Sequence, residues 1–124
     1  PCQSSAASDV YKRQLFQNVL ALSEASKIAE HYKIDTETLF KNISNCSGDS
    51  FALKNHGLKS IARDNFPNPA FSVKYAQKDL SYALEMANQM GLSTPGSTTI
   101  NNLFSKAIDE GYGDLYFPVI KKIL

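Results

Sequence analysis

The longest uninterrupted helical pattern in the sequence covers residues 71–91. It contains no proline or glycine before Gly91, and glycine is the residue type that most often follows the end of a helix. At about 100° per residue, five apolar side chains fall on one face of this helix. They are Val73, Ala76, Leu80, Leu84 and Ala87. We expect this face to be the buried one.

The opposite face of the same helix carries aromatic side chains where solvated residues are expected. Phe71, Tyr75, Lys78 and Tyr82 follow one another at spacings of four, three and four. We call these four residues the aromatic–lysine stripe. Packing against a neighbouring helix, with the lysine reaching water, explains such a stripe most simply. The functional alternative is a cationic donor beside an aromatic wall, which suits a ribose, a carboxylate or a planar ring.

A second long helix is predicted for residues 15–33. Its first turns are apolar on most sides, which is typical of a central, buried helix. On one flank Gln14 and Asn18 lie one turn apart, above Ala21 and Ala25. This flank could form a close contact with another helix or the wall of a groove, and the spacing favours the close contact.

The rest of the chain predicts shorter helices separated by proline, asparagine and glycine. No stretch alternates with period two for long, so no strand is expected. The pattern indicates an all-α fold of six helices with short connections. The four shorter helices are predicted at residues 36–43 after Asp35 or Thr36, 51–62 after Ser50, 98–110 after Ser97, and 118–124 from Pro118.

Composition narrows the functional classes. The chain of 124 residues is 43% hydrophobic and 20% charged, as expected for one globular domain. A formal net charge of +1 indicates no nucleic-acid partner. No apolar run approaches the roughly 18 residues of a membrane span. Cys2 and Cys46 have no metal-binding or redox spacing, and they fit a reducing, cytoplasmic location.

Residues 1–14, PCQSSAASDVYKRQ, differ from the sequence that follows. They begin with proline, lack a hydrophobic stretch, and resemble translated linker or adaptor sequence joined to a gene fragment. We expect this leader to be non-native and disordered, and residues 15–124 to form the domain.

Little catalytic chemistry is visible in individual residues. No glycine-rich phosphate loop follows a strand, and no histidine, cysteine or carboxylate cluster has metal-ligand spacing. His56 stands alone beside Gly57. We expect it to be structural or solvated rather than a base.

The order of several motifs carries more information than any one of them. SGDSFALKNHGLKSI, NFPNPAF, QKDLSYALEMANQMG, STPGSTT and DEGYGDLYFPVI follow one another between residues 47 and 120. Together they resemble the C-terminal helical domain of the β-hydroxyacid dehydrogenases, such as 3-hydroxyisobutyrate dehydrogenase and tartronate semialdehyde reductase. The resemblance covers about residues 15–124, and KDL at residues 78–80 is its most specific part. It implies a C-terminal fragment whose N-terminal Rossmann domain, which binds NAD or NADP, is missing.

The resemblance also assigns roles to four residues. In the family a catalytic lysine opens the long helix, and an asparagine that holds the substrate lies four residues later. Asn18 matches the asparagine, whereas Gln14 occupies the lysine position. Lys78 matches a lysine that contacts the cofactor near the nicotinamide ribose, and Phe71 matches a residue close to the nicotinamide. Lys12 lies two residues out of register, about 200° around the helix, so we do not expect it to replace the lysine.

Two functions follow from the resemblance. The first is an enzyme fragment that completes the substrate and nicotinamide site for a small β-hydroxyacid or semialdehyde, and that forms a homo-oligomer. Ala21 replaces the proton-donating glutamate of the more distant 6-phosphogluconate dehydrogenases, which disfavours decarboxylation. The second is a non-catalytic helical oligomerisation or scaffold module.

Overall fold

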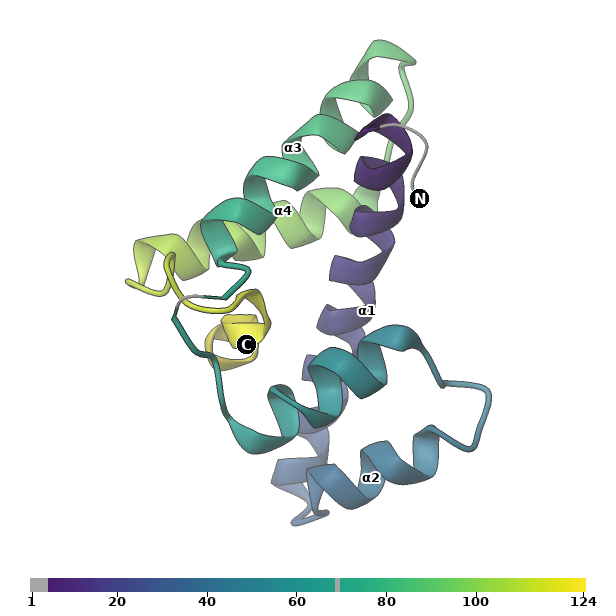
Figure 1. Ribbon diagram of the computed structural model, residues 1–124, viewed down its shortest axis with the longest axis vertical. Coiled ribbons are helices and arrows are strands. Elements are labelled where there is room, and N and C mark those ends of the chain that lie inside the picture. The colour runs from purple at the N-terminus through teal and green to yellow at the C-terminus, as the bar shows by residue number, and fades with distance from the viewer. Residues whose placement is uncertain (1–4, 69) are drawn as a thin grey trace.

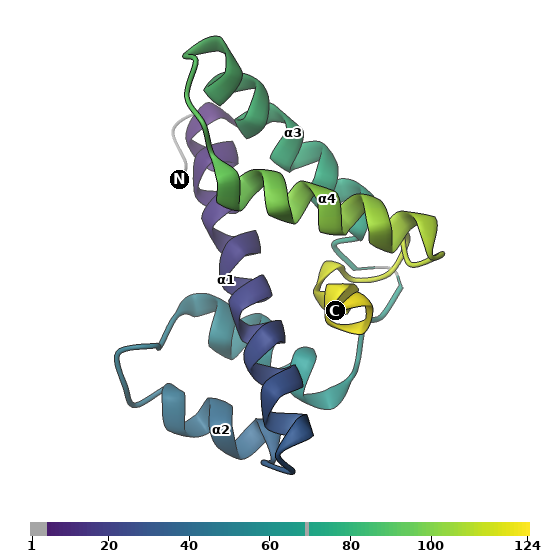
Figure 2. The same cartoon turned by 180° about the vertical axis from the view of Figure 1, so that it is seen from behind.

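The computed structural model describes residues 5–68 and 70–124, and every regular element in these ranges is a helix. The longest is α1 (Ser5–His31), which runs through the molecule and contacts all the other helices (Figures 1 and 2). The predicted all-α fold with a long central helix is therefore confirmed. None of the helices in the described ranges has both the length and the hydropathy that a membrane span requires.

The other helices cover the two halves of α1. Two of them, α3 (Val73–Gln89) and α4 (Pro95–Asp109), pack on each other and on its N-terminal half, and α2 (Thr36–Ile43) lies near its C-terminal end (Figure 2). Three short helices fill the space between them. They are the π-helix η1 (Leu53–Leu58) and the 3₁₀ helices η2 (Ile61–Arg63) and η3 (Phe117–Ile123).

The hydrophobic core centres on Phe16 of α1, which is fully buried. Its ring centroid lies 5.4 Å from that of Phe104 on α4 and 5.2 Å from that of Phe117 on η3, both in edge-to-face arrangements. Aromatic rings prefer this geometry to a face-to-face stack. One side chain of the central helix thus joins it to both neighbouring layers.

The sequence predicts the ends of α2 and α3 to within two residues. Asp35 accepts a hydrogen bond from the Thr38 amide at 3.0 Å, and Ser72 accepts one from the Tyr75 amide at 3.2 Å. These caps satisfy amides that have no partner within the helix. The Ser72 cap places Phe71 just outside α3, and Gly91, with φ +68°, follows its end.

The predicted core face of α3 is confirmed in large part. Four of its five residues are buried and Leu84 is half-buried. The buried residues are Val73, Ala76, Leu80 and Ala87.

Residues 51–62 form a less regular segment than the predicted α-helix. Ser50 accepts a hydrogen bond from the Leu53 amide at 3.1 Å, as expected of a cap. The helix then widens into η1 and tightens again into η2. Gly57 is buried against the Phe40 ring, and a Cβ at this position would lie 3.2 Å from two of the ring's carbons. The close approach of these two groups accounts for glycine within a helix, where it is otherwise unfavourable.

The predicted start of the helix at residues 98–110 is wrong. α4 begins at Pro95 after Thr94, not after Ser97, because proline is well suited to the first position of a helix. Ser97 is instead buried inside α4, where its Oγ lies 3.4 Å from the donating Nε2 of Gln17. The last helix, predicted from Pro118, is present as the 3₁₀ helix η3, which begins one residue earlier at Phe117.

The expectation of a disordered leader is wrong for residues 5–14, which form the first turns of α1. This stretch contains alanine, lysine, arginine and glutamine, which are good helix formers, and no glycine or proline. Residues 1–4, which include Cys2, lie outside the described residues. The non-native origin of the leader stays a prediction. At the other end of α1, Ile28 and Tyr32 are 62% and 70% exposed, so this end is not buried all round.

Candidate functional site

Gln14 and Asn18 lie one turn apart on α1 and open onto the same hollow. Gln14 is exposed and Asn18 is half-buried. The hollow has a volume of about 420 Å³, and the aromatic ring of Phe51 forms part of its wall. Phe51 is 72% exposed although it is fully apolar. Two amide groups and an exposed aromatic ring thus surround one opening.

A second hollow of about 450 Å³ extends from the same two amides along α1. Ala21 and Ala25 form its floor on the helix, and residues of the 43–50 segment form the opposite side. The small alanine side chains leave this space open. This hollow is what the groove alternative predicts for this flank of α1.

Phe71 is held beside this region by its ring and by its backbone. The ring is half-buried and lies 6.2 Å from the Phe16 ring and 5.8 Å from the Phe117 ring. The Phe117 amide donates to the Phe71 carbonyl at 2.9 Å, and Ser72 and Tyr116 form an isolated antiparallel bridge. The C-terminal segment therefore fixes the position of Phe71.

The remainder of the aromatic–lysine stripe is exposed. Tyr75 and Tyr82 are 63% and 42% exposed, and Lys78 is exposed. No described residue forms an ion pair with Lys78, and its side chain lines none of the hollows described here. The structure thus brings Gln14 and Asn18 together, with Phe71 nearby, and leaves Lys78 on the outer face of α3.

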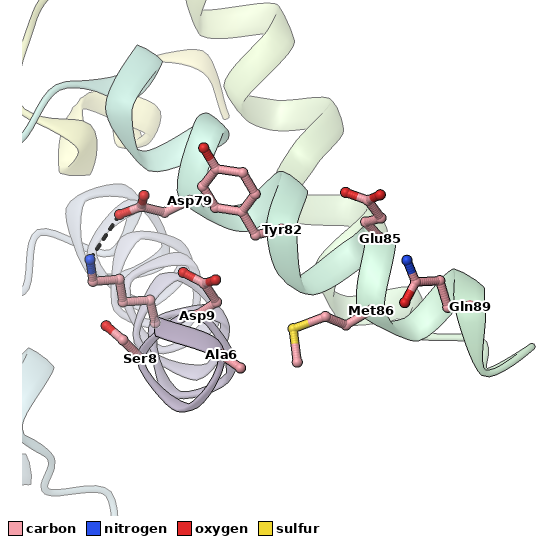
Figure 3. A pocket seen from close by; sticks show the side chains of 9 residues that line it. Ala6, Ser8, Asp9, Asp79, Tyr82, Glu85, Met86 and Gln89 are labelled. Carbon is pink, nitrogen blue, oxygen red and sulfur yellow. Dashed lines mark hydrogen bonds and ion pairs between the residues drawn. The ribbon is translucent and has the colours of Figure 1, made fainter. Parts of the chain in front are cut away.

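Asp79, the residue after Lys78, points instead toward α1 and was not singled out from the sequence. Its Oδ2 lies 2.8 Å from the Lys12 Nζ (Figure 3). This hydrogen bond to the carboxylate raises the pKa of Lys12. The pair lies at a hollow of about 680 Å³ between the start of α1 and α3, also lined by Tyr82 and Glu85 (Figure 3).

Lys12 also reaches the candidate site, despite its rotation away from Gln14. Its side chain lines the hollow that contains Gln14 and Asn18, and its Nζ lies 5.6 Å from the centroid of the Phe71 ring. A long, flexible side chain spans the distance that the helical rotation creates. The helical angle alone therefore does not exclude Lys12 from this hollow.

His56 is more closely bound into the structure than a solvated histidine. It lies in η1, is half-buried, and its Nδ1 is hydrogen-bonded to the hydroxyl of Tyr116, 60 positions away. Its ring centroid lies 5.2 Å from that of Phe117. Burial, and then the nearby Lys59, lower the pKa of His56, and burial raises the pKa of Tyr116. Both groups are therefore neutral near pH 7.

The described residues contain no group of three or more histidine, cysteine, aspartate or glutamate side chains that could hold a metal ion. Cys46 is a free, exposed thiol. The site consists of amides, aromatic rings and one lysine, Lys12. This chemistry suits the binding of a polar organic ligand with a flat ring.

Comparison with known proteins supports this interpretation. The model of a protein family described as "NAD-binding of NADP-dependent 3-hydroxyisobutyrate dehydrogenase" matches residues 14–121. Glyoxylate/succinic semialdehyde reductase 1 of Arabidopsis thaliana is 30% identical over 100 residues, which are 81% of this chain and 34% of the relative. The 2-hydroxy-3-oxopropionate reductase of Escherichia coli (strain K12) is 31% identical over 98 residues, or 79% and 33% of the two chains.

Two solved structures share the fold. A 3-hydroxyisobutyrate dehydrogenase from Salmonella typhimurium superposes with a TM-score of 0.84 at 21% identity, over 94% of this chain and 40% of that one. The Mycobacterium tuberculosis 3-hydroxyisobutyrate dehydrogenase with L-serine gives a TM-score of 0.81 at 21% identity, over 95% and 42%. This chain spans about a third of the length of the curated relatives that it matches.

Proposed function

Because the chain belongs to the NAD-binding family of NADP-dependent 3-hydroxyisobutyrate dehydrogenase, we propose that it forms the C-terminal helical part of a β-hydroxyacid dehydrogenase. The intact enzyme would transfer a hydride between a small β-hydroxyacid, or its semialdehyde, and NAD or NADP. The observation that carries the proposal is the shared hollow of Gln14 and Asn18, with Phe71 held nearby.

NAD or NADP would supply the hydride chemistry, and the protein would bind and orient the reactants. The Asn18 amide has two donors and a carbonyl acceptor, which suit the hydroxyl and carboxylate oxygens of the substrate. The Phe71 ring offers a flat apolar face for the nicotinamide. The exposed Lys78 ammonium is free to meet the cofactor near its ribose once a Rossmann domain covers α3.

Gln14 is a poor replacement for the lysine of the family. Its amide can donate a hydrogen bond, but it does not exchange a proton near neutral pH. We therefore propose that lysine is the native residue at position 14 and that Gln14 belongs to foreign sequence. The family match begins at residue 14, so position 14 is the first that aligns with the family.

The competing proposal is a non-catalytic scaffold, and Gln14 is the observation that favours it. The exposed Tyr75 and Tyr82 would then serve self-association alone. In the enzyme proposal the same residues are covered by the cofactor and the Rossmann domain, and the enzyme is a homo-oligomer. We place the enzyme in the cytoplasm, where the free thiol of Cys46 would stay reduced.

Joining the chain, with Gln14→Lys, to the Rossmann domain of the Escherichia coli relative would separate the two proposals. Oxidation of NADPH or NADH would be followed with glyoxylate, succinic semialdehyde and 2-hydroxy-3-oxopropionate. We expect Asn18→Ala to raise the substrate KM, and Lys78→Ala to weaken cofactor binding. Lys74→Ala, an exposed position on the same helix, is the control. A correctly folded fusion that binds the cofactor but turns over none of these substrates would favour the scaffold.

A further inference from the structure

A small pocket lies between α1, η1 and the segment that holds Phe71. Its volume is about 140 Å³ and its walls are almost entirely apolar. An apolar cavity of about 150 Å³ is known to bind benzene, so this pocket has the size of one six-membered ring. Its lining residues are Leu15, Phe16, His56, Phe71, Tyr116 and Phe117, with Lys12 at the edge.

His56 contributes its imidazole ring to the wall of this pocket. A phenol hydroxyl is a stronger donor than an imidazole N–H, and an imidazole nitrogen is a stronger acceptor than a phenol oxygen. The Tyr116 hydroxyl therefore donates to the His56 Nδ1, and the proton of the neutral imidazole lies on Nε2. No described residue accepts a hydrogen bond from Nε2. His56 also lies in a π-helix, a distortion that occurs often at functional sites.

The pocket adjoins the hollow that contains Gln14 and Asn18, because Lys12 and Leu15 line both. A substrate whose polar groups meet Asn18 would thus have a side group within reach of the pocket. A charged side group would fit badly, since burying a charge without a partner is costly. Lys12 offers no free partner, because its Nζ is paired with Asp79 at 2.8 Å.

We propose that this pocket is the subsite for the side group of the substrate, and that His56 is a specificity-determining residue within it. The subsite would take an uncharged, apolar group no larger than one six-membered ring. In this proposal the His56 Nε2–H lies at the rim of the pocket, so a group with a hydrogen-bond acceptor at that edge would be preferred. The identification of the bound group as part of a substrate rests on the proposed function. Binding of such a group does not, because it requires only the pocket.

The test uses the full 124-residue chain and two probes of equal size, toluene and phenol. Binding would be followed by NMR, through contacts between the probe and the methyl groups of Leu15 and through the ring resonances of Phe71. We expect both probes to contact Leu15 and Phe71. We also expect the affinity of phenol relative to toluene to fall about two- to tenfold in His56→Leu, the range for one net hydrogen bond. Tyr116→Phe should lower the same ratio by less, because the imidazole ring stays but its tautomer is no longer fixed.

Two controls keep the result specific. Leu15→Phe fills the pocket and should weaken both probes, whereas Tyr75→Phe, at an exposed position outside it, should change neither. Absence of probe contacts with Leu15 in the unchanged chain would overturn the subsite, and an unchanged ratio in a folded His56→Leu protein would overturn the role of His56. Either result would leave the proposed enzymatic function standing. Conversely, if the fusion enzyme is inactive but its pocket still binds phenol, the pocket remains a binding site and only its assignment to a substrate is overturned.

Discussion

The Lys121 Nζ lies 2.6 Å from the Glu30 carboxylate, so the last helix of the chain is joined to the end of α1 by a largely buried cation. The Asp64 carboxylate lies 2.9 Å from the same nitrogen, and the Ile61 carbonyl accepts from it at 3.3 Å. Burial alone would lower the pKa of Lys121, but the hydrogen bonds to Glu30 and Asp64 raise it. The ammonium therefore stays charged and ties three segments together.

Removal of this cation should destabilise the fold. Breaking a fully buried ion pair costs about 3–5 kcal/mol. Glu30 and Asp64 are 44% and 64% exposed, so water can hydrate them, and we expect Lys121→Ala to cost about 1–3 kcal/mol in urea unfolding. Lys74→Ala removes an exposed pair with Asp114 and should cost less than about 1 kcal/mol. Equal losses in the two variants would contradict this account of Lys121.

The half-buried His56 should make stability depend on pH. The pKa of His56 in the folded chain is lowered by burial and by Lys59 from its ordinary value of 6.5, so the unfolded chain binds a proton more readily. The contribution of His56 to stability is complete above pH 6.5 and is lost as the pH falls toward the lowered pKa.

We expect the thermal midpoint to fall between about pH 7.5 and about pH 5.5, and to fall less in His56→Gln. His31→Gln, at an exposed position at the end of α1, is the matched control and should keep the dependence of the unchanged chain. A His56→Gln protein with the same pH dependence as the unchanged chain would show that another group is responsible.

Two buried serines on α1 should respond differently to the same substitution by alanine. The Ser26 hydroxyl is buried and has no hydrogen-bond partner among the described residues, whereas the Ser23 hydroxyl donates to the Val19 carbonyl at 2.8 Å. A buried polar group without a partner costs about 1–3 kcal/mol. We expect Ser26→Ala to raise the free energy of unfolding by about 1 kcal/mol relative to Ser23→Ala. Both variants replace serine by alanine within the same helix, so the effect of helix propensity cancels when the two are compared. Equal free energies of unfolding would contradict the prediction.

The exposed Tyr75 and Tyr82 of the aromatic–lysine stripe should make the chain self-associate. Contiguous exposed apolar surface tends to find a partner. We expect oligomers by light scattering at about tens of micromolar, an order of magnitude suited to weak interfaces, and a shift toward monomer in the double variant Tyr75→Ser and Tyr82→Ser. The matched control is Met90→Ser, because Met90 is 76% exposed but lies outside the stripe. A single monomeric species in the unchanged chain would contradict this prediction.

The sequence predicts the long helices well, because their apolar periodicity and their caps are local properties. The caps at Asp35 and Ser72 and the glycine at position 91 need no knowledge of the fold. The π-helix around His56 could not be predicted in this way, since it forms where Gly57 packs against Phe40 of another helix.

The candidate site was predictable to a similar extent. The one-turn spacing of Gln14 and Asn18 indicates a shared surface, and the structure shows the hollow there. The pairs Lys12–Asp79 and His56–Tyr116 join residues 67 and 60 positions apart, and nothing in the local sequence connects them. Pairs of this kind depend on the packing of whole helices.

We propose that position 14 is the place of the acid–base lysine of a β-hydroxyacid dehydrogenase. The most direct measurement is the turnover of the chain joined to a Rossmann domain, compared between Gln14 and Gln14→Lys. A positioned acid–base group contributes about 10²- to 10⁴-fold in rate, and we predict a gain of that size with little change in cofactor affinity. Lys12→Ala in the Gln14 protein is the necessary control, because Lys12 lines the same hollow. A Gln14 protein that is already fast, or a Gln14→Lys protein that gains nothing, would contradict the account.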